Sequence, residues 1–306
     1  MVSVGDVGGG GLIEAPGTRD REELETSAKR ADSRRGLLIA LPSYVYLVLF
    51  FAVPFLIVVV YSFATRSRTG RTVLEGWNLD SYARLGDPIV REIFLRSLTL
   101  AVVTTVVCLV VSYPFAYYIA TRRPIVRNVL LVLVMIPFWS NFLVRTYAWR
   151  VLLGNNGPIS QISQFFGGEE IRILFTNTAV LIGLVYGYLP FMVLPLYASL
   201  ERMDWNLVEA ARDLYASGWT AFRRVTLPLS MPGVVAGSIL VFIPSLGAYV
   251  TPALLGGART TLLGDYIVGQ FLAARNWPYG SALSVAVMIV MLIAAIFYFR
   301  AGAKST

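Results

Sequence analysis

The side chains that most often carry out chemistry are scarce in this sequence. There is one cysteine, Cys108, and no histidine among the 306 residues. An internal disulfide, a Cys/His metal cluster and a histidine-based catalytic dyad are therefore excluded. No segment matches G-x-x-x-x-G-K-[ST], so the chain has no P-loop with which to hold ATP phosphates. These absences argue against most hydrolase chemistry, and we expect no metal site and no resident cofactor.

A second set of candidate residues lies in or beside long apolar stretches, where polar side chains are rare. Arg145 is the outstanding charge, because an ionisable residue inside a membrane normally faces a helix-bundle interior or water. It also lies about 27 Å along a helix from Arg127, where a long side chain can reach the interface, so a structural role is the competing interpretation. The other candidates for a solute path are Trp139, Asn141, Tyr147, Tyr249 and Thr251, with Asp265 as the nearest acidic residue.

The composition indicates an integral membrane protein. Hydrophobic residues make up 56% of the chain and charged residues 14%, whereas a soluble domain carries roughly 25% charged residues. The mean hydropathy of +0.66 means that much of the surface must face lipid. In a membrane protein the net charge of +8 informs about how basic residues are distributed between the two sides of the membrane, and it does not indicate a nucleic-acid partner.

Six apolar stretches are long enough to cross about 30 Å of hydrocarbon as helices. Residues 1–35 precede them and are predicted to be a disordered tail. Prolines within the stretches predict kinks that face other helices or a water-filled path. No Asp or Glu lies within the predicted spans, which run over about 36–63, 94–121, 128–153, 178–200, 232–255 and 281–299.

The distribution of basic residues predicts the orientation. With the N-terminus inside, 15 arginines and lysines are cytoplasmic and 8 are external. Both termini are then cytoplasmic, as are Arg122 and Arg123, while 155–177 and 256–280 are external. The first external loop departs from the rule, since it contains five arginines interspersed with acidic residues.

The segment between the fourth and fifth spans, Leu200 to Gly233, is too long for a simple connection. Such loops need about 2 to 8 residues, whereas this one has about 30. Asp204 is placed to cap a helix that has Leu207, Ala210, Ala211 and Leu214 on one side. Trp219, Phe222 and Val225 form a second apolar stripe, which ends near Pro228 and Pro232. Two short amphipathic helices are predicted, either resting on lipid or docking on a cytoplasmic partner.

This segment resembles the EAA loop in the permease subunits of binding-protein-dependent ABC importers. The resemblance rests on Glu209-Ala210-Ala211 followed at long spacing by Val225-Thr226-Leu227-Pro228, and it extends from about Leu95 to Arg300. Within that family the spermidine/putrescine-type permeases are the most similar, through PFWSNFLVRTYAW (137 to 149), LPFMVLPLYASLERMD (189 to 204), EAARDL (209 to 214), VFIPSLGAYVTPALLGG (241 to 257) and QFLAARNWPYGSALS (270 to 284).

The resemblance implies the type I ABC importer permease fold. This fold has six transmembrane helices, with a permease core over 94–300 and a cytoplasmic coupling-helix loop between helices four and five. The implied partners are a cytoplasmic ABC ATPase dimer that binds ATP and Mg, a second related permease and an extracytoplasmic substrate-binding protein. The implied location is the bacterial inner membrane. The residues expected to couple the loop to the ATPase are Glu209, Ala210, Ala211, Asp213, Tyr215, Gly218, Leu227 and Pro228.

One position departs from the family pattern. The family has a glycine four residues after the second alanine, whereas this chain has Tyr215 there and Gly218 three residues later. Glycine adopts positive φ without steric cost, while tyrosine rarely does. Two alternatives follow: the turn is shifted to Gly218, or the first helix runs one turn longer.

The implied function is ATP-driven import of a small solute, with polyamines ahead of other organic cations, amino-acid-like compounds and iron complexes. Two other classes compete with it. A secondary transporter or channel would work without ATP and would not need the long loop. An intramembrane enzyme would need a nucleophile and a base facing each other in the membrane, and the sequence lacks that arrangement.

Overall fold

The computed structural model describes residues 40–67, 71–74, 76–166, 169, 172–257 and 260–303. The tail predicted over 1–35 lies outside these residues. The chain divides into two compact units, Met1–Ile57 and Val58–Thr306. The first unit contributes most of an apolar helix that runs over Ala40–Ser62 and includes the π-helical turn η1 (Val48–Ala52) and α2 (Val53–Ser62).

Proline accounts for the π-helical turns. Pro54 lies two residues after η1 and has no N–H to donate to the carbonyl four residues earlier, which is within η1, so the hydrogen-bond ladder is rearranged there. The same relation holds for η3 (Phe222–Thr226), which precedes Pro228. In lipid a backbone group freed by proline has no water with which to pair. A rearrangement that gives this group another backbone partner is therefore favourable.

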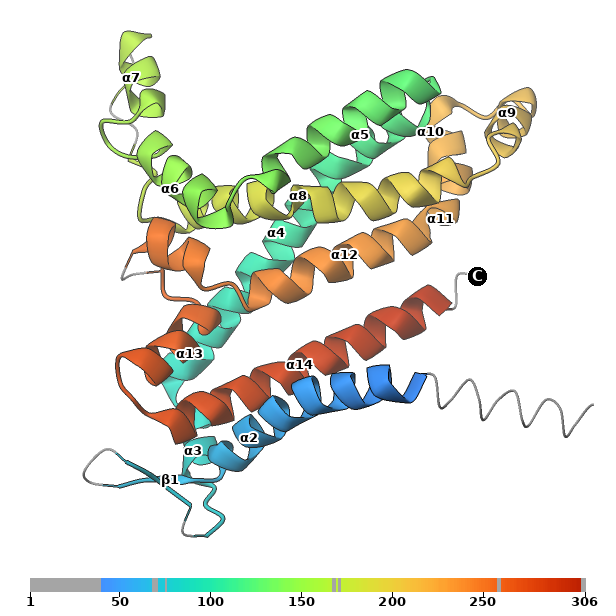
Figure 1. The fold of residues 1–306 in the computed structure, drawn as a ribbon. Helices are drawn as coiled ribbons and strands as arrows, with labels where there is room; N and C mark the ends of the chain where they lie inside the picture. The colour runs from blue at the N-terminus through green and yellow to red at the C-terminus, as the bar shows by residue number, and fades with distance from the viewer. Residues whose placement is uncertain are drawn as a thin grey trace, which may run out of the picture. The chain divides into compact units, whose positions relative to one another are not determined.

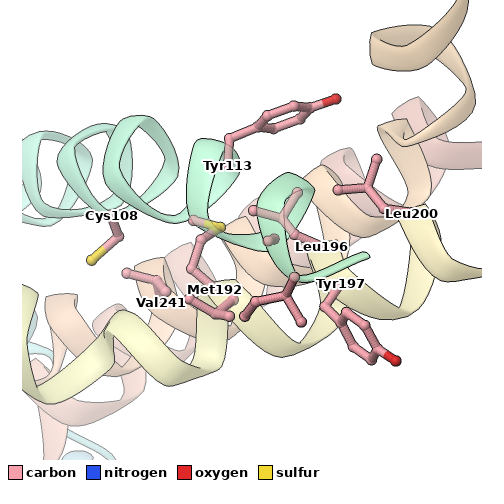
Figure 2. Packing of buried hydrophobic residues seen from close by; sticks show 10 residues of the cluster. Cys108, Tyr113, Met192, Leu196, Tyr197, Leu200 and Val241 are labelled. Carbon is pink, nitrogen blue, oxygen red and sulfur yellow. The ribbon is translucent and has the colours of Figure 1, made fainter. Parts of the chain in front are cut away.

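The second unit is built around three helices that pack side by side, α4 (Pro88–Ala120), α8 (Asn177–Glu201) and α12 (Met231–Leu246) (Figure 1). Figure 2 shows part of the buried cluster between them, which contains Cys108 and Tyr113 from α4, Met192 and Leu196 from α8, and Val241 from α12. Each of these residues is at most 8% exposed. The cluster joins helices that are distant in sequence.

Glycines on α12 let it approach α8 closely. A Cβ at Gly237 would lie 2.7 Å from the Met192 sulfur, and one at Gly233 would lie 2.6 Å from the Pro195 carbonyl oxygen. Small residues at helix interfaces allow this proximity, which strengthens van der Waals packing in a membrane. The α8–α12 contact therefore depends on the absence of side chains at these two positions.

The remaining elements surround this core (Figure 1). Before α4 lie an antiparallel pair of short strands and two short helical segments. The elements, in chain order, are β1 (Thr65–Arg66), β2 (Thr72–Val73), α3 (Asp80–Ala83), η2 (Arg84–Gly86), α5 (Pro124–Trp139), α6 (Phe142–Leu152), α7 (Pro158–Phe165), η4 (Pro252–Gly256), α13 (Leu263–Leu272) and α14 (Trp277–Ala303).

The described residues contain four helices long and apolar enough to cross a membrane, or up to six spans if each of two bent pairs counts as one. Two of the predicted spans, 128–153 and 232–255, are not continuous helices. The third span breaks between α5 and α6 with a bend of 88°, and α12 ends at Leu246 and is bent by 65° from the helix before it. Pro137 and Pro244 lie two residues before these two helix ends, where each proline lacks the N–H that would bond to the carbonyl four residues earlier and so weakens the last turn.

The boundaries of the helices also correct the statement that no carboxylate lies within a span. Helix α4 begins at Pro88 and so includes Glu92, while Glu201 is the last residue of α8. Both carboxylates are paired: Glu92 with Arg96 at 2.7 Å and Glu201 with Arg127 at 2.8 Å. Both carboxylates lie near a helix end, so the middle of α4 and the middle of α8 contain no Asp or Glu.

Candidate functional site

The segment from Glu201 to Met231 forms two short helical stretches at the end of α8 opposite to α6 and α7 (Figure 1). The first is α9 (Asn206–Asp213), and the second runs from α10 (Gly218–Ala221) through η3 to α11 (Leu227–Leu229). The Asp204 carboxylate accepts the Asn206 N–H at 3.0 Å, and the Ser217 hydroxyl accepts the Thr220 N–H at 3.2 Å. Both stretches therefore begin with a side chain that satisfies a free backbone N–H.

Aromatic contacts attach this segment to α4. The Tyr113 ring meets Phe222 edge-on at 5.4 Å, and the Tyr117 ring meets Trp205 edge-on at 5.5 Å. The hydroxyl groups of Tyr113 and Ser230 share a hydrogen bond of 2.6 Å. Aromatic pairs of this geometry add to the energy of apolar burial. These contacts hold the two short helical stretches against α4.

The turn between the two helices lies at Tyr215 itself. Tyr215 has φ +60°, its N–H donates to the Arg212 carbonyl at 2.9 Å, and the Ala216 N–H donates to the Ala211 carbonyl at 3.1 Å. These two bonds form a Schellman motif, whose left-handed residue is usually glycine. Both alternatives from the sequence are therefore wrong: α9 ends at Asp213, and Gly218 has no positive φ.

One face of this segment is apolar and exposed. Leu207 is 47% exposed, Leu214 83%, Tyr215 99% and Trp219 69%. The buried contact of α9 is made by Val208, with Met203 and Ala221. Of the side recognised from the sequence as apolar, Leu207 and Leu214 are therefore exposed, whereas Ala211 packs in the cluster around Val208. Exposed apolar surface of this kind marks contact with a partner or with lipid.

The other predicted coupling residues lie along the same segment. Glu209 is exposed and, within the described part of the chain, has no hydrogen-bond or ion-pair partner. Ala210 is exposed beside it, while Ala211 is half-buried in the cluster around Val208. The rest follow along the chain: Asp213 ends α9, Gly218 begins α10, and Leu227 and Pro228 belong to α11. The structure places all of them on one segment, and their coupling role stays a prediction.

The residues predicted to line a solute path are not brought together. Arg145, on α6, lines a cavity with Tyr186 and Pro190 of α8. Asn141 caps α6 by accepting the Leu143 N–H at 2.8 Å, and Thr251 is buried beside Gly183. Trp139, Tyr147 and Tyr249 are exposed, at 77%, 51% and 49%.

Asp265 lies in the first turn of α13, half-buried. Burial raises the pKa of its carboxyl, because the charged form loses hydration. Among the described residues, no group of three or more His, Cys, Asp or Glu side chains could hold a metal ion.

Sequence reasoning missed the contacts that join the helix ends next to the two short helical stretches. Arg127 of α5 pairs with Glu201 of α8 at 2.8 Å, and Tyr113 bonds Ser230 across 117 positions of sequence. No local pattern signals either pair. The pair of Arg127 and Glu201 could have been suggested only by the opposite charges of these two residues, which lie at the ends of apolar stretches.

A bundle of apolar helices with an exposed two-helix segment at one end is the architecture expected of a multi-pass membrane protein. The sequence profile of the "Binding-protein-dependent transport system inner membrane component" family matches residues 112–303. The chain belongs to this family.

Individual relatives support the same assignment. The spermidine/putrescine transport system permease protein PotB of Salmonella typhimurium (strain SL1344) is 44% identical over 259 residues, covering 84% of this chain and 90% of that protein. The inner membrane ABC transporter permease protein YdcU of Escherichia coli (strain K12) is 34% identical over 233 residues, covering 72% and 74%. A bacterial ABC transporter that imports alginate contains a chain with TM-score 0.71 and 16% identity, covering 92% of this chain and 99% of that one. This likeness shows the type I importer permease fold.

Proposed function

We propose that the chain is a permease subunit of an ATP-driven importer and forms the path for a polyamine such as spermidine or putrescine. The observation that carries this proposal is the 44% identity to PotB over most of both chains. The other expected subunits are an ABC ATPase dimer that binds ATP and Mg, a second related permease and an external binding protein that delivers the solute. The polypeptide itself is non-catalytic.

Within this proposal, the segment from Leu200 to Gly233 is the contact with the ATPase. The support is its exposed apolar side chains, the Glu209 carboxylate, which has no partner among the described residues, and the aromatic contacts that attach the segment to α4. Glu209 pairs with a basic group or backbone donors of the ATPase, and ATP-driven closure of the ATPases moves the spans between outward and inward access. Lipid contact is the competing role for this face.

Uptake of labelled spermidine tests the substrate and the energy source together. Cells that lack their own polyamine importers receive the chain with its three expected partners, and uptake is measured with and without ATP depletion. We expect uptake that requires ATP and that putrescine inhibits more strongly than an amino acid or an iron complex does. ATP-independent uptake would instead support a secondary transporter. ATP hydrolysis by the purified polypeptide alone would contradict the need for a partner ATPase.

Cysteine accessibility tests the orientation, with both termini and the Leu200 to Gly233 segment cytoplasmic. Cys108→Ala provides the background. Gln164 and Arg212 are both exposed and provide the two labelling positions. An impermeant reagent added to intact cells should label Gln164→Cys but not Arg212→Cys, and the reverse pattern would refute the orientation.

A further inference from the structure

A cavity of about 430 Å³ lies between α4, α5 and α8. Its walls include Phe115 of α4, Leu133 of α5 and Tyr186 of α8. These three side chains are exposed, so the cavity opens on the outer surface of the chain. Apart from the Tyr186 hydroxyl, the only polar group in the lining is the guanidinium of Arg145, from α6. A side chain from outside the chain can therefore enter an apolar space that contains a single positive charge.

The chain does not neutralise the Arg145 guanidinium. It lies 5.0 Å from the centre of the Phe138 ring and 5.9 Å from that of Phe142, and such contacts compensate only part of the hydration that a buried cation loses. Its Nε is buried without a hydrogen-bond partner, and no carboxylate among the described residues pairs with it. The Nε of Arg127 is unpaired too, but Glu201 lies 2.8 Å from its Nη1 and neutralises that charge. Arg145 therefore lacks an anion that the other arginine has.

The guanidinium of Arg145 lies near the middle of the bundle. Phe138 on α5 and Pro190 on α8 are each about 16 Å along their helix from the pair of Arg127 and Glu201, at 1.5 Å per residue. The guanidinium contacts the Phe138 ring and shares the cavity with Pro190, so it lies at this level. The distance is half of a hydrocarbon thickness of about 30 Å. A charge at this depth is costly unless a group within the membrane pairs with it, and side chains of neighbouring helices provide such groups.

We propose that Arg145 pairs with a carboxylate on a membrane-spanning helix of the second permease. The carboxylate enters the cavity from the surface beside Leu133 and accepts hydrogen bonds from the guanidinium, while apolar side chains of the same helix contact the rest of the walls. A second copy of this chain would not supply the group, because no Asp or Glu lies within its six apolar stretches as predicted, and those at helix ends lie too far from this level. A polyamine would be repelled by the cation. The inference rests on the proposed function, from which the second permease is expected.

Chemical coupling in the assembled transporter tests the pair directly. Arg145→Lys places an amine in the cavity, and dicyclohexylcarbodiimide condenses an amine and an adjacent carboxylate to an amide, taking up the water that is released. Mass spectrometry of the digested assembly then identifies the coupled residue. We expect coupling to an Asp or Glu in an apolar stretch of the second permease. Arg150→Lys is the matched control and should give no such product, because Arg150 is exposed on the same helix and does not line the cavity.

Co-purification of the second permease measures the strength of the contact. Arg145→Gln should weaken association about 10- to 100-fold, because it leaves the carboxylate of the second permease buried and unpaired. Arg145→Lys should recover part of the association, and Arg150→Gln should associate as wild type does. Arg145→Glu should associate most weakly, and replacing the coupled acid by arginine should then restore association. This restoration excludes misfolding of the Arg145→Glu chain as the cause of the loss.

The outcomes separate this inference from the proposed function. If the wild-type chain retains a second permease and Arg145→Gln and Arg145→Glu retain it equally well, the inference is wrong and the proposed function stands. Coupling of Arg145→Lys to a carboxylate of this chain, or to none, would also overturn the inference. If the wild-type chain associates with no second permease, the proposed assembly and the inference both fail.

Discussion

Replacing Tyr215 by glycine should stabilise the turn that joins α9 to α10. The backbone of Tyr215 has φ +60°, a conformation that costs an L-residue about 1 to 2 kcal/mol. Glycine removes that strain but adds freedom to the unfolded chain, which offsets about 0.4 to 1 kcal/mol. The Tyr215 side chain is 99% exposed, so its removal sacrifices no packing within the chain. The expected net stabilisation is about 0.5 to 1 kcal/mol.

Hydrogen exchange measured by mass spectrometry on peptides covering 206–217 tests this value. The Ala216 N–H, which donates to the Ala211 carbonyl at 3.1 Å, reports directly on the turn. A stabilisation of about 0.5 to 1 kcal/mol lowers the local opening constant by about 2- to 5-fold, so exchange should slow by that factor.

Ala216→Gly is the matched control, because Ala216 does not have positive φ. Glycine brings only conformational freedom there and should speed exchange. Unchanged or faster exchange in Tyr215→Gly would refute the argument that backbone strain is stored at this residue. If Tyr215 also contacts the ATPase, Tyr215→Gly will slow exchange and weaken ATPase association at the same time.

Three further perturbations test other parts of the molecule. Glu209→Arg should weaken ATPase association by about one or two powers of ten and abolish stimulation by the loaded binding protein. Glu169→Arg, at another exposed residue, should do neither. Normal transport by Glu209→Arg would refute the coupling role. Gly237→Leu should lower stability by about 1 to 3 kcal/mol, because a Cβ at this position would lie 2.7 Å from the Met192 sulfur. Thermal unfolding in detergent measures the loss. Gly269→Ala is the control, because a Cβ at Gly269 would have no neighbour within 4 Å. Burial raises the pKa of the Asp265 carboxyl, so its ionisation lowers the stability of the fold as the pH rises through that pKa. Asp265→Asn should therefore become more stable relative to wild type between about pH 4 and about pH 7. An equal difference in thermal midpoint between the two proteins at both pH values would refute this.

The sequence by itself determined the class of the protein, because hydropathy and motif spacing are local properties of the chain. The apolar stretches around 94–121, 178–200 and 281–299 correspond to α4, α8 and α14, since a helix in lipid must be both apolar and long enough to cross it. The loop with Glu209-Ala210-Ala211 likewise identified the family before any contact was known.

The tertiary structure decided the directions of the helices and the contacts between distant residues, because a local sequence pattern encodes neither. Apolar length cannot show that the third span turns by 88° after Pro137, because a proline permits either a kink or a break and packing selects between them. Tyr215 adopts φ +60° because the hydrogen bonds to Arg212 and Ala211 outweigh its own preference. Arg145 was visible as a charge in an apolar stretch, but only the packing of α4, α5 and α8 created the cavity that it lines.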